Sequence, residues 1–132
     1  MRAAVLDSYA VLAYLFGEAG KDKVVSVLER AAETAKNTFI AAPNWAEVRY
    51  QVERKVGPSK WHGLAEKLLA LPIEVVAVDR VLAESAGGLK AQHRMSLADC
   101  FCAALAKDRK ADIYTGDPEF KTVEHLVRIV WL

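Results

Sequence analysis

The sequence predicts an α/β fold of three layers, in which helices cover both faces of a central parallel sheet. Short apolar segments alternate along the chain with longer segments whose apolar residues recur at helical spacing. The short segments are apolar throughout, which is typical of strands that are buried on both faces. The chain has 132 residues and contains no repeat or linker, so we expect one domain over residues 1–132.

The first part of the chain supplies two of these strands. Residues 3–6 form a short apolar run, and a helix is expected over 8–16, ending at Gly17. A second helix is expected over 21–36, where apolar residues recur three or four positions apart. The second strand, 38–41, follows directly.

The middle of the chain contains residues that are typical of helix ends. Pro43 suits a first helical turn, so a helix is expected over 43–56. The Gly-Pro pair at 57–58 ends it. A further helix over 59–70 leads to the β-branched segment 73–78, which we predict to be the third strand.

The last part of the chain repeats the alternation. A helix is expected over 79–92, with a break at the glycine pair 87–88. A second helix, 96–107, leads to a strand at 112–115, and a last strand is expected at 127–131. Alternation of this kind favours parallel strands joined by right-handed crossovers.

Composition narrows the classes of function. Lys plus Arg is 18 and Asp plus Glu is 17, so a nucleic acid could bind only through a local basic patch. An apolar content of 53% is high for so small a chain and indicates an interface with a partner. Cys100 and Cys102 point to different sides of one predicted helix, so we expect no disulfide and a reducing, cytoplasmic location. The longest apolar run, Tyr9–Phe16, is too short to span a membrane.

Two predicted strands are followed by a carboxylate. Asp7 comes directly after the first strand, and Asp117 follows the fourth strand after one glycine. Both belong at the carboxyl edge of the sheet, where ligands bind in parallel α/β folds. Structural roles are open for both: Asp7 could cap the next helix, and Asp117 could form a turn before Pro118.

Two further acids are placed less certainly by spacing. Asp99 lies in segment 97–106, which is otherwise apolar and therefore predicted to be a buried helix. It could serve a site, or it could complete a capping box with Ser96 as the N-cap. Glu47 lies opposite the apolar stripe of its helix, which favours a solvated side chain, although it stands early in a helix that follows a strand.

Carboxylates that converge on one edge repel one another, and a hard divalent cation resolves this repulsion. Mg²⁺ or Mn²⁺ would suit oxygen ligands and would bridge to a phosphate group. Such an ion polarises a phosphodiester and lowers the pKa of a bound water. The acidic residues therefore favour phosphoryl chemistry at this edge.

At these residues the sequence resembles the PIN-domain nucleases, and within them the VapC-type toxins of bacterial and archaeal toxin–antitoxin pairs. The resemblance covers the whole chain. The segments that carry it are Leu6-Asp7-Ser8, Asn44-Trp45-Ala46-Glu47-Val48, Ser96-Leu97-Ala98-Asp99, and Thr115-Gly116-Asp117-Pro118-Glu119-Phe120.

The resemblance implies a specific set of site residues. Asp7, Glu47, Asp99 and Asp117 would form an acidic quartet that holds Mg²⁺ or Mn²⁺ directly or through water, and Glu47 would also help to orient the attacking water. The supporting hydroxyls are expected from Ser8, Ser96 and Thr115. Glu119 stands where some members carry a further Asp, and its role is left open. The resemblance also implies metal-dependent RNA cleavage, a homodimer, and a small antitoxin protein that blocks the site.

Two other functions stay open. In a phosphatase or phosphotransferase, Asp7 would be the nucleophile, but haloacid-dehalogenase-like enzymes need a second Asp two residues later, where this chain has Tyr9. A non-catalytic protein-binding module on the same fold would have little reason to keep four mutually repelling acids.

Two basic segments could contact RNA. One is the cluster formed by Arg49, Arg54, Lys55 and Lys60, for which a solvated face is the alternative. The other is the pair His93-Arg94, just before the third motif.

Overall fold

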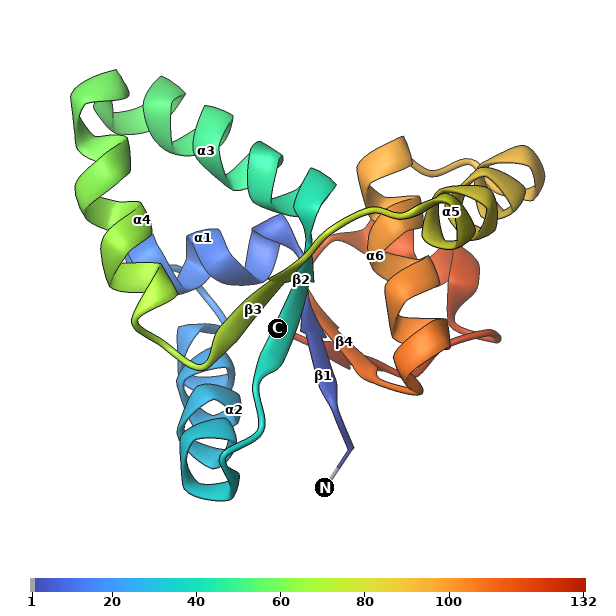
Figure 1. Cartoon of the computed structure of the whole chain (residues 1–132), viewed down its shortest axis with the longest axis horizontal. Coiled ribbons are helices and arrows are strands. Elements are labelled where there is room, and N and C mark those ends of the chain that lie inside the picture. The colour runs from blue at the N-terminus through green and yellow to red at the C-terminus, as the bar shows by residue number, and fades with distance from the viewer. Residues whose placement is uncertain (1) are drawn as a thin grey trace.

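The computed structural model describes residues 2–132 and contains a five-stranded sheet with the order β3-β2-β1-β4-β5 (Figure 1). All neighbouring strands run parallel. The strands are β1 (Ala4–Leu6), β2 (Thr38–Ala41), β3 (Ile73–Val76), β4 (Asp112–Thr115) and β5 (Ile129–Trp131). Within the described residues, no helix has the length and apolar character needed to cross a bilayer.

Helices cover the sheet on both faces, as predicted. Helices α1 to α4 lie on one side of the sheet and α5 and α6 on the other (Figure 1). The helices are α1 (Ser8–Phe16), α2 (Lys21–Thr34), α3 (Ala42–Val56), α4 (Trp61–Leu69), α5 (Arg80–Gln92) and α6 (Leu97–Arg109), with short 3₁₀ helices η1 (Pro58–Lys60) and η2 (Pro118–Val123). The three-layer α/β prediction is confirmed.

The hydrophobic core has two halves, one on each face of the sheet. Leu6 and Ile40 pack toward α1–α4, whereas Val5 and Ile113 pack toward α5, α6 and η2. Successive strand residues point to opposite faces, so both halves require apolar side chains. This requirement explains why the strands of this protein are apolar without alternation.

The predicted break at Gly87-Gly88 is wrong, because α5 is continuous from Arg80 to Gln92. Both glycines face solvent, and a side chain at either would meet open space. The opposite side of the helix buries Leu82, Ala86 and Leu89. Glycine costs about 1 kcal/mol at a helical position relative to alanine, and the packing of this face outweighs that cost.

Several predicted ends differ from the observed ones. The expected helix 59–70 is divided into η1 and α4, and the expected strands 73–78 and 127–131 are each two residues shorter. Helix α2 ends at Thr34 rather than 36, and α6 extends to Arg109 rather than 107. Helices α2 and α6 are capped by Ala35 and Lys110, which adopt left-handed conformations with φ of 54° and 51° that the periodicity of apolar residues does not report.

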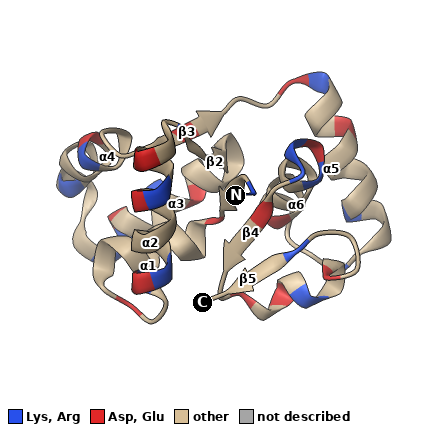
Figure 2. Cartoon of the chain, turned by 90° about the horizontal axis from the view of Figure 1, so that it is seen from below, with Lys and Arg blue, Asp and Glu red and all other residues tan. Residues whose placement is uncertain are grey.

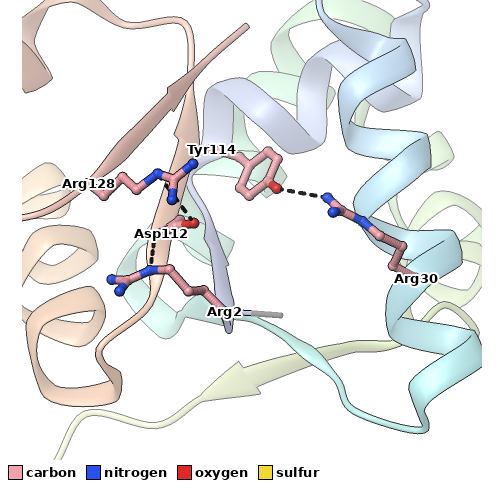
Figure 3. A network of polar contacts seen from close by, with 5 residues as sticks. All are labelled: Arg2, Arg30, Asp112, Tyr114 and Arg128. Atoms are coloured by element: carbon pink, nitrogen blue, oxygen red, sulfur yellow. Dashed lines mark hydrogen bonds and ion pairs between the residues drawn. The ribbon is translucent and has the colours of Figure 1, made fainter.

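The amino-terminal edge of the sheet carries a network of arginines (Figure 3). Buried Asp112, the first residue of β4, accepts a hydrogen bond from Arg2 Nε at 2.5 Å and lies 3.9 Å from Arg128 Nε. Two residues later, the Tyr114 hydroxyl accepts from Arg30 at 3.2 Å. These contacts link the ends of β1, β4 and β5 to one another and β4 to α2.

The strand order places a switch point between β1 and β4. From β1 the chain moves to β2 and then β3 on one side, and β4 and β5 lie on the other side. The carboxyl ends of β1 and β4 therefore border a crevice from which the crossovers diverge. Helices α1 and α3 begin at this edge of the sheet, directly after β1 and β2.

Candidate metal centre

Asp7 lies at the switch point, immediately after β1, and is almost fully buried with 1% of its surface exposed. Its Oδ1 accepts a hydrogen bond from Ala10 N at 2.9 Å, so the residue caps α1. Its Oδ2 accepts from Thr115 Oγ1 at 2.5 Å, which joins the ends of β1 and β4. Asp7 therefore both caps α1 and lies at the ligand edge of the sheet.

The surroundings of Asp7 disfavour its charge. Burial raises the pKa of this carboxyl to about 7, against the hydrogen bonds from Thr115 and Ala10, which lower it. The charges of Asp117 and Glu47 add to the increase. Asp7 therefore lies within electrostatic range of both of these acids.

Asp99 occupies the first turn of α6. The Ser96 hydroxyl caps this helix by accepting from Asp99 N at 3.2 Å. Burial, and then the charges of Asp7, Asp117, Glu119 and Glu47, together raise the pKa of the Asp99 carboxyl to about 8. A carboxyl group in this position is stabilised by protonation or by a cation.

Asp117 and Glu119 are held by the loop after β4. Asp117 Oδ1 accepts from Glu119 N at 2.9 Å, and Thr115 Oγ1 accepts from Asp117 N at 3.0 Å. The Glu119 carboxylate accepts a hydrogen bond from the backbone N–H of Ser96, which ties this loop to the start of α6.

Three of these acids meet closely. One carboxylate oxygen from each of Asp99, Asp117 and Glu119 lies within 4.8 Å of the other two. Oxygens on opposite sides of an octahedral Mg²⁺ ion are about 4.2 Å apart, because each Mg–O bond is about 2.1 Å. The donor set therefore fits a small hard cation after slight contraction.

The family model that matches this chain is that of the PIN domain, and the match covers residues 4–126. The chain belongs to the PIN domain family. No curated protein sequence is significantly similar to it.

Solved structures of similar fold include toxin–antitoxin proteins. VapBC2 from Rickettsia felis, bound to promoter DNA, shares 17% identity over 97% of each chain, with a TM-score of 0.75. DNA-bound VapBC from Salmonella typhimurium shares 21% identity over 98% of each chain, with a TM-score of 0.74. VapC20 from Mycobacterium tuberculosis, described as a toxin that cleaves the sarcin–ricin loop, shares 17% identity over 90% of this chain and 93% of that chain, with a TM-score of 0.70.

In this PIN domain, Glu47 lies in the second turn of α3 and is half-buried. Its Oε1 accepts a hydrogen bond from the Ser8 hydroxyl, and its Oε2 accepts from the Tyr50 hydroxyl at 3.0 Å. The solvated position that spacing favoured is therefore not observed. Asp7 and Glu47 are not among the three acids within 4.8 Å, but both contribute to the raised pKa of Asp99.

The structure adds residues that the sequence interpretation did not include. Tyr50 follows Glu47 by three positions, a spacing at which helical side chains meet. Asn44 precedes Glu47 by three positions, is fully buried, and has no hydrogen-bond partner for its amide anywhere in residues 2–132. Buried amides of this kind are rare, and only the structure reveals this one.

Tyr9 packs over the loop between Thr115 and Asp117. A side chain at Gly116 would place its Cβ 2.3 Å from Tyr9 Cε1, so the ring of Tyr9 requires glycine there. The ring is 41% exposed beside the acids. Tyr9, which occupies the position where haloacid-dehalogenase-like enzymes need a second Asp, therefore borders the site.

Proposed function

We propose that this PIN domain is an endoribonuclease dependent on Mg²⁺ or Mn²⁺, and that it is the toxin of a toxin–antitoxin pair. The observation that carries the proposal is the convergence of Asp99, Asp117 and Glu119 within 4.8 Å beyond the carboxyl edge of the sheet. We propose that Asp7, Asp99 and Asp117 hold the ion directly or through water, with Glu119 as an additional ligand. Glu47 completes the acidic pocket.

The hydroxyl groups around the acids have positioning roles in this proposal. Ser8 and Tyr50 hold both oxygens of Glu47, so its carboxylate has a fixed direction from which to orient the attacking water. Thr115 donates to Asp7 and accepts from the backbone of Asp117, which fixes the two acids relative to one another. When bound, the ion supplies polarisation of the phosphodiester and a water of lowered pKa.

The structural relatives support the choice of substrate and partner. They include VapBC proteins, a toxin–antitoxin complex and a toxin that cleaves the sarcin–ricin loop, on chains that this protein matches almost end to end. We therefore propose RNA as substrate, a small antitoxin as partner, a homodimer as the assembly, and the cytoplasm as the location. The whole chain, 1–132, would act as one nuclease domain.

The contacts of Asp7 count against the phosphatase alternative. Both of its oxygens accept hydrogen bonds, from Ala10 N and Thr115 Oγ1, and only 1% of its surface is exposed. A nucleophile needs an accessible oxygen in line with the phosphorus atom. Each carboxylate oxygen has a second lone pair, so these contacts leave Asp7 able to hold the ion directly or through water, but they turn it away from attack on phosphorus.

RNA cleavage measured against Mg²⁺ and Mn²⁺ concentration tests the proposal. Asp99→Asn and Asp117→Asn should each remove nearly all activity while the protein stays folded. Asp108→Asn is the matched control, because Asp108 is an exposed acid at the far end of α6. Undiminished cleavage by the wild-type protein in excess EDTA would show that the acids do not act through a metal.

The proposed partners are tested by purification from the native operon. We expect a small protein to accompany the chain, and sedimentation of the isolated chain to show a dimer. A single species of 14.5 kDa at micromolar concentration, with no accompanying protein, would contradict both assemblies.

A further inference from the structure

A groove of about 600 Å³ lies beside the acids, between the end of α5, the start of α6 and η2. Its lining includes Lys90, His93, Arg94, Ser96 and Glu119. We propose that this groove binds a phosphate of the RNA strand next to the scissile one, with Arg94 as the main contact. This inference rests on the proposed ribonuclease function.

The groove is continuous with the acidic cluster. Glu119 lines the groove and is also one of the three acids whose oxygens lie within 4.8 Å of one another. Ser96 lines it too, and its backbone N–H donates to Glu119. A strand whose scissile phosphate lies at the cluster would therefore extend into the groove with its neighbouring phosphate.

The cations of the groove remain available to a ligand. Within residues 2–132, the guanidinium of Arg94 has no hydrogen bond or ion pair, and the residue is exposed. Lys90 Nζ donates to Met95 O at 2.6 Å, which fixes the ammonium group at the groove and leaves two further donors. The ring of His93 lies 6.0 Å from that of His125, so a second imidazole is also close.

The other basic cluster near the site is less available. Arg49 Nε donates to Glu53 at 2.7 Å, and the guanidinium of Arg54 lies 4.7 Å from the centre of the Tyr50 ring. Elsewhere, Lys and Arg are spread over several helices on both sides of the sheet (Figure 2). The groove is therefore one place where a cation without an ion pair in residues 2–132, Arg94, borders the acids.

A phosphate suits this position electrostatically. The acids repel an RNA backbone, so productive binding needs cations close to the site but outside the metal ligands. Arginine provides a planar set of donors for phosphate oxygens. The start of α6, at Ser96, adds the positive end of a helix dipole to the same wall.

The test is steady-state cleavage of a single-stranded RNA in Mg²⁺ over a range of NaCl concentrations. Arg94→Gln should raise KM about tenfold at low salt and leave kcat within about twofold, because it removes a charged hydrogen bond outside the reacting atoms. The slope of log(kcat/KM) against log[NaCl] should become shallower by about 0.7, the value for one phosphate contact on a single strand. Arg94→Lys should recover part of the loss.

The matched control is Arg80→Gln, which removes the same charge from the exposed start of α5, where Arg80 is paired with Glu84 at 2.9 Å. It should change neither KM nor the salt slope. If the wild-type protein cleaves RNA and the two variants have the same KM and the same salt slope, the groove assignment alone is overturned. A wild-type protein that cleaves no RNA would overturn the proposed function and the groove assignment together.

A second measurement locates the phosphate. The cleavage position is first mapped with wild type, and single methylphosphonates are then placed on either side of it. At one of these positions the neutral group should raise the KM of the wild-type protein. With that substrate, Arg94→Gln should raise KM no further. If Arg94→Gln keeps its full effect with every neutral substitution, or affects only binding of a copurifying protein, the phosphate assignment is wrong.

Discussion

Replacing Asp7 with asparagine should stabilise the metal-free protein at pH 8. The folded-state pKa of Asp7 is about 7, against 3.8 for the free side chain. Between these values the folded protein holds a proton that the unfolded chain has lost, so stability falls as the pH rises from about 4 to about 7. Asparagine does not titrate and therefore avoids this loss.

The structure sets the size of the effect. A difference of about 3 pKa units corresponds to about 4 kcal/mol above pH 7, which is an upper limit because neighbouring acids share protons. We expect a gain of about 1–3 kcal/mol, or roughly 4–12 °C in melting temperature. Asparagine can keep the bond from Ala10 N, and the Thr115 hydroxyl can rotate to accept from the new amide.

The assay is a series of thermal and urea melts from pH 5 to pH 8.5 in EDTA. The control is Asp79→Asn, because Asp79 caps α5 through Leu82 N at 2.8 Å in the same way but is exposed. That variant should be neutral or slightly destabilised at every pH. Millimolar Mg²⁺ should stabilise wild type more than Asp7→Asn. Parallel curves of stability against pH for Asp7→Asn and wild type would refute the reasoning.

Three further predictions concern the core and the backbone. Asn44→Leu should raise the free energy of unfolding by about 1 kcal/mol in urea, because it removes a buried amide without a partner; a lower value would show that the amide is satisfied. Cys100 and Cys102 should resist a thiol reagent until the protein unfolds, because burial raises the pKa of both thiols; rapid labelling of the native protein would contradict this. Gly20→Ala should lower the melting temperature by at least about 4 °C, because Gly20 has φ +91° and the new Cβ would lie 2.4 Å from Leu132 Cβ; an unchanged melting temperature would contradict the contact.

Most of the fold could be predicted because local signals and tertiary packing agree. The glycine at 17 ends α1 in a left-handed conformation, and Gly57 ends α3. The glycine pair in α5 predicts a break that is not observed, because propensity is a weak preference that packing of the opposite face overrides. Short apolar runs predict the strands correctly, because both faces of this sheet are covered by helices.

The site could be predicted only in part. Residues that follow parallel strands gather at the carboxyl edge of the sheet, which places Asp7 and Asp117 together. The charge of Asp117 contributes to the raised pKa of Asp7, in agreement with this placement. Spacing along the chain could not show that Glu119 reaches the cluster, because this depends on its contact with Ser96 N across the fold. Neither could it show that Glu47 is held by Ser8, which is thirty-nine positions away in sequence.

Two of the acids, Asp7 and Asp117, are also helix caps, and a third, Asp99, lies beside the cap of α6; this overlap helps the fold to tolerate the repulsion among the acids. Asp7 caps α1, Ser96 caps α6 beside Asp99, and Asp117 caps η2. Backbone N–H groups at these starts stabilise negative charge where the carboxylates repel one another. Replacing an Asp with Asn keeps the acceptor oxygen but removes the charge, and therefore separates the effect of capping from the effect of charge repulsion. If the repulsion controls stability, Asp99→Asn should stabilise the metal-free protein and abolish RNA cleavage, whereas Ser96→Ala should destabilise it by about 1 kcal/mol through loss of the cap.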